Sequence, residues 1–241
     1  MKNNKINGIE LKNNKVIDCD TIIFNGDPKA LFDGLLGDEI QNAVSNNNIN
    51  KRSLSAYVWS FAAKTQGLDL LHHNVLFNKN YRTEFDDIKR GEIPKDPTLY
   101  ICAQGSINNP RPKEKSLGRF EIIINGSPTY NHKKYNKQKE YTKCKEITFS
   151  ILDSMGLKMD LKPTEEMLTT PKEFEQLFPG SQGSLYGRTP HGISSTFMRP
   201  RNKSKIKGLL LAGGGTHPGA GIPMACLSGK HAAEMILKDL S

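Results

Sequence analysis

The chain has 241 residues, a formal net charge of +9 at neutral pH and 36% hydrophobic residues. That length can bury the core of one or two domains, and no stretch approaches the ~18 consecutive apolar residues that a membrane-spanning helix requires. The four cysteines lack Cys-x-x-Cys spacing, which argues against a zinc motif and against a disulfide framework. We therefore expect a cytoplasmic protein with reduced thiols.

The N-terminal region predicts short strands followed by a helix. Residues 6–17 have the pattern of a β-hairpin, and the apolar residues 21–24 predict a further strand. Asp27 followed by Pro28 is typical of a helix cap with proline at the first helical position. The sequence therefore predicts a helix over residues 29–36.

The middle of the chain alternates strand and helix patterns. Strands are predicted where apolar residues alternate or cluster, at residues 56–62, 75–77, 99–103 and 121–125. Residues 136–155 carry an apolar side at helical spacing, and Gly156 is placed to end that helix. Thr170 and Glu173 form a capping box around a first-turn proline, which predicts the start of a short helix.

His72 and His73 are adjacent in a segment that resembles a strand. Successive side chains of a strand point to opposite faces, so the two imidazoles are not expected to chelate one ion. No metal is predicted.

Tyrosines are interleaved with lysines between residues 130 and 141. Such a pattern suits nucleic acid, but a solvated helix face produces it more often. No nucleic-acid partner is therefore expected.

The C-terminal segment is the most informative. Residues 209–211 predict a buried strand and residues 221–240 predict a helix that packs closely. Glycines fill the connection, at positions 213, 214, 215, 219 and 221. Glycine permits positive φ and close approach of a ligand to the backbone, and the following helix directs its free N–H groups at the turn. The pattern suits an anionic or strongly polar ligand, although a tight strand-to-helix connection also accounts for it.

The amino-acid sequence of this segment resembles a known motif. Leu-Leu-Leu-Ala-Gly-Gly-Gly-Thr-His-Pro-Gly-Ala-Gly-Ile-Pro-Met, from Leu209 to Met224, is similar to the C-terminal flavin motif of bacterial carotenoid desaturases of the phytoene desaturase type. Further similar blocks lie at residues 21–28, 54–61, 72–77, 96–104 and 184–192. The Phe-Asn-Gly-Asp-Pro and Leu-Tyr-Gly-Arg blocks most resemble the branch that desaturates hydroxylated or methoxylated neurosporene at C-3,4.

The resemblance implies a fold and a missing partner. It implies the C-terminal part of a Rossmann-like, amine-oxidase-like flavoprotein of the α/β (α+β) class. The expected division is a residual flavin-domain hairpin and strand at 1–27, a mixed-sheet and helix substrate domain at 28–201, and a flavin-domain strand, loop and helix at 202–241. The family's N-terminal dinucleotide-binding βαβ unit has no counterpart here, so a separately encoded N-terminal Rossmann half is an implied partner.

The resemblance also implies an activity and its residues. The activity is carotenoid desaturation with hydride passing to FAD, and because carotenoids lie in bilayers, peripheral membrane association is expected. Lys or Arg near anionic lipid contributes about 1 kcal/mol each. The residues that match the family's flavin-binding positions are Gly213, Gly214, Gly215, Gly221, Ile222, Pro223 and Met224.

Four further residues have two interpretations each. His217 is either a proton acceptor beside the flavin or a structural cap of the turn. Arg188 and His191 either meet the hydroxyl end of the substrate or bond neighbouring carbonyls. Trp59 either lines a substrate channel or belongs to the core.

Alternative functions remain open at this point. One is a non-catalytic carotenoid- or lipid-binding module, and another is an inactive gene fragment with exposed apolar surface. Within the same family, phytoene desaturation and carotenoid isomerisation are also open.

Overall fold

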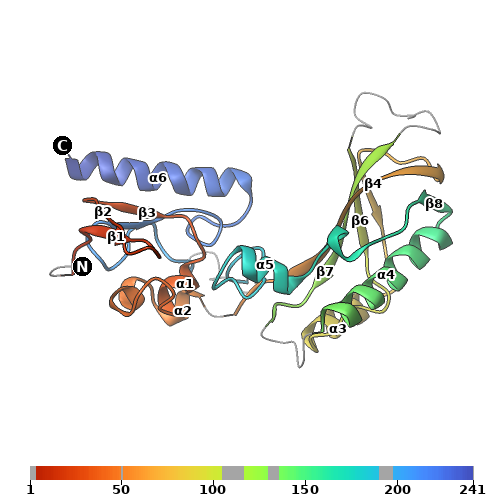
Figure 1. Cartoon of the computed structure of the whole chain (residues 1–241), viewed down its shortest axis with the longest axis horizontal. Coiled ribbons are helices and arrows are strands. Elements are labelled where there is room, and N and C mark those ends of the chain that lie inside the picture. The colour runs from red at the N-terminus through yellow and green to blue at the C-terminus, as the bar shows by residue number, and fades with distance from the viewer. Residues whose placement is uncertain (1–3, 50, 105–116, 130–135, 190–197, 241) are drawn as a thin grey trace. The chain divides into compact units, whose positions relative to one another are not determined.

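A computed structural model describes residues 4–49, 51–104, 117–129, 136–189 and 198–240 (Figure 1). The chain forms two compact units. We call Met1–Ser53 with Glu175–Ser241 the loop unit, and Leu54–Phe174 the sheet unit. Each unit combines strands with helices, which confirms the α+β class.

The sheet unit is built on an antiparallel sheet in the order β5-β6-β7-β4-β8, with β9 paired to β4. Its elements are β4 (Ser55–Gly67), β5 (His73–Leu76), α3 (Tyr81–Lys89), β6 (Leu99–Gln104), β7 (Gly118–Gly126), α4 (Lys137–Ser154), β8 (Leu157–Asp160), the 3-10 helix η3 (Glu165–Met167) and β9 (Leu168–Thr169). Helix α5 (Pro171–Leu177) follows β9.

One face of this sheet packs against α4. Trp59 of β4 is completely buried there, and its indole N–H donates to Thr148 Oγ1 of α4 at 3.1 Å. Ile101 of β6 and Ile122 of β7 are buried in the same core, together with Leu152 of α4. Alternation along β6 places its even-numbered residues on the opposite face.

The loop unit has three layers (Figure 1). Its elements are β1 (Gly8–Glu10), β2 (Val16–Asp18), β3 (Ile22–Phe24), α1 (Pro28–Phe32), the 3-10 helix η1 (Asp38–Ala43), α2 (Asn46–Ile49), β10 (Leu209–Leu211) and α6 (Ile222–Leu240). Strands β3 and β10 pair in parallel, Leu209 and Leu211 pack with Leu31 and Ile49, and Leu210 packs with α6. This burial on both faces explains the unbroken apolar run at 209–211.

Most predicted elements are confirmed. Asp27 caps α1 by accepting from the Lys29 N–H at 2.9 Å. The capping box is also present, because the Thr170 N–H donates to Glu173 Oε2 at 2.8 Å and the Glu173 N–H lies 3.4 Å from Thr170 Oγ1. Helix α1 is shorter than predicted, since the chain turns through Gly34 at φ +73°.

The boundaries of the two units differ from the predicted division. Residues 28–53 and 175–201 belong to the loop unit and not to a body spanning 28–201. The reason is packing: Leu31 and Ile49 share a core with β10, and Arg52 donates to the Ser181 carbonyl at 3.2 Å.

Candidate functional site

The glycine-rich connection from β10 to α6 forms the centre of the candidate site. It follows the parallel pair directly, and the Ala212 N–H donates to the Phe24 carbonyl at 3.0 Å. Gly213, Gly219 and Gly221 have φ of +113°, +148° and +97°. These values lie in the region that disfavours side chains, so the backbone path itself requires glycine there.

Close packing requires glycine at a further position. A Cβ on Gly215 would lie 2.8 Å from Pro28 Cδ, at the start of α1. A Cβ on Gly214 would meet only ordinary contacts, 3.6 Å from the Ala220 Cα. The loop is therefore seated on the β3–α1 turn through Gly215, while Gly214 has space beside it.

Two buried polar side chains hold the loop in place. Arg199 donates from Nη1 to the Gly214 carbonyl at 2.7 Å and from Nη2 to the Arg188 carbonyl at 3.0 Å. Asn202 donates from Nδ2 to the Leu211 and Ser228 carbonyls, each at 2.9 Å. Sequence reasoning missed both residues, because an arginine and an asparagine in a polar segment carry no signal of burial.

The surroundings of Arg199 shift its pKa. Arg199 is 6% exposed, and this burial lowers the pKa of its guanidinium. The positive charge of Arg52 lowers that pKa further. Asp27 acts in the opposite direction. Two buried arginines near one carboxylate leave this side of the loop positive, which suits an anionic or electron-rich ligand.

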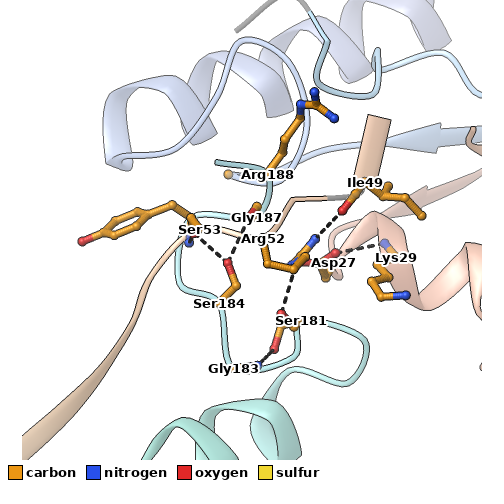
Figure 2. Close-up of polar contacts among 12 residues, drawn as sticks. Asp27, Lys29, Ile49, Arg52, Ser53, Ser181, Gly183, Ser184, Gly187 and Arg188 are labelled. Carbon is orange, nitrogen blue, oxygen red and sulfur yellow. Dashed lines mark hydrogen bonds and ion pairs between the residues drawn. The ribbon is translucent and has the colours of Figure 1, made fainter. Parts of the chain in front are cut away.

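A second network joins three segments that are distant in the sequence (Figure 2). Arg52 pairs with Asp27 and donates to the carbonyls of Ile49, at 3.4 Å, and Ser181, at 3.2 Å. The exposed fractions of the Arg52 and Asp27 side chains are 3% and 9%, so the pair is largely shielded from water. Beside it, the Ser184 hydroxyl donates to the Gly187 carbonyl at 2.9 Å.

The predicted site residues occupy different places. Gly213, Gly214, Gly215, Gly221 and the first turn of α6 lie together in the loop unit. His217 lies in the same loop, where its backbone N–H donates to the Pro200 carbonyl at 2.8 Å. Arg188 donates to the Asn47 carbonyl, which is the carbonyl-bonding arrangement that the sequence left open.

Trp59, a further predicted substrate contact, belongs to the sheet unit. Trp59 is completely buried in the core of the sheet unit, against Tyr141 and Phe149. Its ring therefore offers no surface to a ligand in this structure. His191 lies outside the described residues.

The loop has features that fit a flavin cofactor. Ile222 and Met224 are 82% and 41% exposed, and a Cβ on Gly221 would meet nothing within 4 Å. The first N–H groups of a helix have no partner within the helix. Thr216 is fully buried and its hydroxyl has no hydrogen-bond partner among the described residues. Backbone N–H groups that are exposed at a helix start can donate to the polar atoms at the edge of a flavin ring system.

One prediction in the sheet unit is wrong. The rings of His72 and His73 do not point to opposite faces: their centroids lie 4.2 Å apart. His73 begins β5, whereas His72 lies in a bend before it. The alternation rule therefore does not apply to the pair.

Comparison with known proteins identifies relatives of the chain. The family model described as flavin containing amine oxidoreductase matches residues 151–237. The hydroxyneurosporene desaturase of Cereibacter sphaeroides is 48% identical over 97% of this chain and 46% of its own length. Those of Rhodobacter capsulatus and Rubrivivax gelatinosus are 45% and 38% identical, over 99% and 97% of this chain and 47% and 44% of their own lengths.

These matches confirm the resemblance to carotenoid desaturases and support FAD as the cofactor. The chain spans about half the length of the curated relatives it matches, in agreement with the C-terminal half that the motifs indicated. Within the described residues, none of the helices has the length and apolar character to cross a bilayer.

Proposed function

We propose that this chain is the C-terminal half of a carotenoid desaturase that acts at C-3,4 of a hydroxylated or methoxylated carotenoid such as hydroxyneurosporene. The observation that carries the proposal is the 48% identity to a hydroxyneurosporene desaturase over 97% of the chain. The open glycine loop at the start of α6 supports it, because that loop is where the resemblance is most specific in sequence.

In this proposal the loop unit holds the reactive end of the cofactor. FAD, when bound, accepts the hydride that leaves the substrate. Arg199 fixes the Gly214 carbonyl, and the exposed first turn of α6 offers N–H groups to the polar edge of the ring system. These groups bind and orient, and none of them needs to act as a nucleophile.

The proposal includes an N-terminal dinucleotide-binding half, on the same chain or on a separate one. Strand β3 pairs only with β10 within its described sheet, and two parallel strands are few for a stable parallel sheet. Peripheral membrane association belongs to the proposal as well, because the substrate is a bilayer lipid and the chain carries a net charge of +9.

The flavin part of the proposal is tested with two matched surface variants of α6. Ile222 and Leu237 are both exposed, at 82% and 67%, at opposite ends of the helix. The full chain would be co-purified with the N-terminal half of the Cereibacter sphaeroides relative, and the bound flavin measured by absorbance. Ile222→Glu is expected to reduce bound flavin at least tenfold, since a carboxylate would occupy the electropositive helix start, and Leu237→Glu is expected to leave it unchanged.

The outcomes separate the candidate functions. Equal flavin content in both variants would refute the placement of the cofactor at α6. Carotenoid bound by the chain with no flavin under any condition would instead favour a carotenoid- or lipid-binding module.

A further inference from the structure

Three potential metal ligands gather on the sheet unit. His73 of β5 is directly opposite Cys102 of β6, so their side chains share one face of the sheet. His72 precedes β5, and its carbonyl accepts from the Ala103 N–H at 2.8 Å. One ligand atom from each of His72, His73 and Cys102 lies within 4.8 Å of the other two.

The hydrogen bonds of the two imidazoles leave ring nitrogens available. His72 Nδ1 lies 3.2 Å from the Ala103 carbonyl oxygen, which only accepts, so Nδ1 carries the proton. The lone pair is then on Nε2, which lies 3.8 Å from Cys102 Sγ. His73 Nδ1 lies 2.7 Å from the Tyr100 hydroxyl. A hydrogen bond from the second ring nitrogen to a carbonyl or another polar group is the usual support of a metal-bound histidine.

The distances approach those of a tetrahedral zinc site. Zinc binds imidazole nitrogen at about 2.0 Å and thiolate sulfur at about 2.3 Å, which places neighbouring ligand atoms about 3.5 Å apart. The 3.8 Å between His72 Nε2 and Cys102 Sγ is already close to that value. His73 is exposed, so an ion can reach its ring from the solvent side.

We propose that His72, His73 and Cys102 bind one Zn²⁺ ion, with the fourth position open to water. One thiolate and two imidazoles form a ligand set that binds Zn²⁺ in preference to Mg²⁺ or Ca²⁺. Cys102 is 8% exposed while His73 lies at the surface, so the ion enters from the solvent side and the thiolate closes the inner side. The ion ties the residues before β5 to β6. Every residue of this site belongs to the sheet unit, and its test measures metal binding without flavin.

The test uses the full chain, stripped with a chelator and titrated with Zn²⁺ by calorimetry and with Co²⁺ as a spectroscopic probe. One equivalent is expected to bind, and bound Co²⁺ is expected to show thiolate-to-cobalt charge-transfer absorption. Cys102→Ser is expected to abolish that absorption, and His73→Asn, at an exposed position, is expected to weaken binding at least tenfold without unfolding the protein. Tyr100→Phe, which removes a supporting hydrogen bond, is expected to weaken binding about 10-fold.

Cys226→Ser provides the matched control. Cys226 is an exposed thiol in the loop unit, and its loss is expected to change neither stoichiometry nor absorption. The proposal is overturned if the unmodified chain binds no Zn²⁺, if His73→Asn and Cys102→Ser both bind as tightly as the unmodified chain, or if Cys226→Ser removes the charge-transfer band.

Discussion

The neighbouring residues Gly214 and Gly215 provide a sharp test of how the loop is seated. A Cβ on Gly215 would lie 2.8 Å from Pro28 Cδ, whereas an ordinary contact is 3.4–4 Å, so the loop or the start of α1 must move by at least about 0.6 Å. Pro28 is buried and its ring is rigid, so neither side yields easily. Overpacking of this kind costs about 1–3 kcal/mol. The entropy that alanine removes from the unfolded chain returns about 0.4–1 kcal/mol.

Gly215→Ala is therefore expected to lower the free energy of unfolding by about 1–2 kcal/mol. Gly214→Ala is expected to raise it by about 0.4–1 kcal/mol, because its Cβ meets only an ordinary contact at 3.6 Å and the backbone there needs no positive φ. Urea unfolding followed by circular dichroism measures both. Equal effects of the two substitutions, or a more stable Gly215→Ala, would refute the described packing of the loop on α1.

Three further predictions concern buried ionisable groups. Arg52→Met leaves the Asp27 carboxylate buried without its partner and is expected to lower the free energy of unfolding by about 3–5 kcal/mol. Lys230→Ala, at an exposed ion pair, is the control and is expected to lower it by under about 1 kcal/mol. An equally small effect of Arg52→Met would show that the Arg52–Asp27 pair is not shielded from water. Burial raises the pKa of Cys144 from 9.0 to about 12, so mass spectrometry after iodoacetamide at pH 8 should show native protein modified at the exposed Cys226 and not at Cys144. Because the native thiol keeps its proton longer than the unfolded one, Cys144 contributes stability that is complete below pH 9 and lost toward pH 12, and Cys144→Ala should flatten the fall in stability over that range.

Local chemistry allowed much of the fold to be predicted. Asp27 before Pro28, and Thr170 three residues before Glu173, satisfy helix N–H groups within a few residues of sequence. Such capping patterns can be predicted from the sequence, because the two partners are only a few residues apart along the chain. The buried strand at 209–211 was recognisable for a related reason, since only a strand covered on both faces is apolar throughout.

Long-range partners were not predictable from the sequence. Arg52 finds Ser181 across 129 positions, and Arg199 holds Gly214 through a carbonyl, which no residue pattern encodes. For the same reason the sequence pattern did not distinguish Gly214 from Gly215, although of the two only Gly215 packs closely against Pro28. His72 escaped the alternation rule because β5 begins at His73, so only one of the two histidines lies in the strand.

The most direct test of the account is the reaction itself. The chain would be combined with the N-terminal half of the Cereibacter sphaeroides relative, FAD and hydroxyneurosporene, and the product measured by chromatography and mass spectrometry. The relative's own two halves, divided at the same point, serve as the positive control. We expect a product that has lost two hydrogens at C-3,4 in both reactions. Product from the relative's halves, with none from this chain although it binds the same partner and FAD, would contradict it.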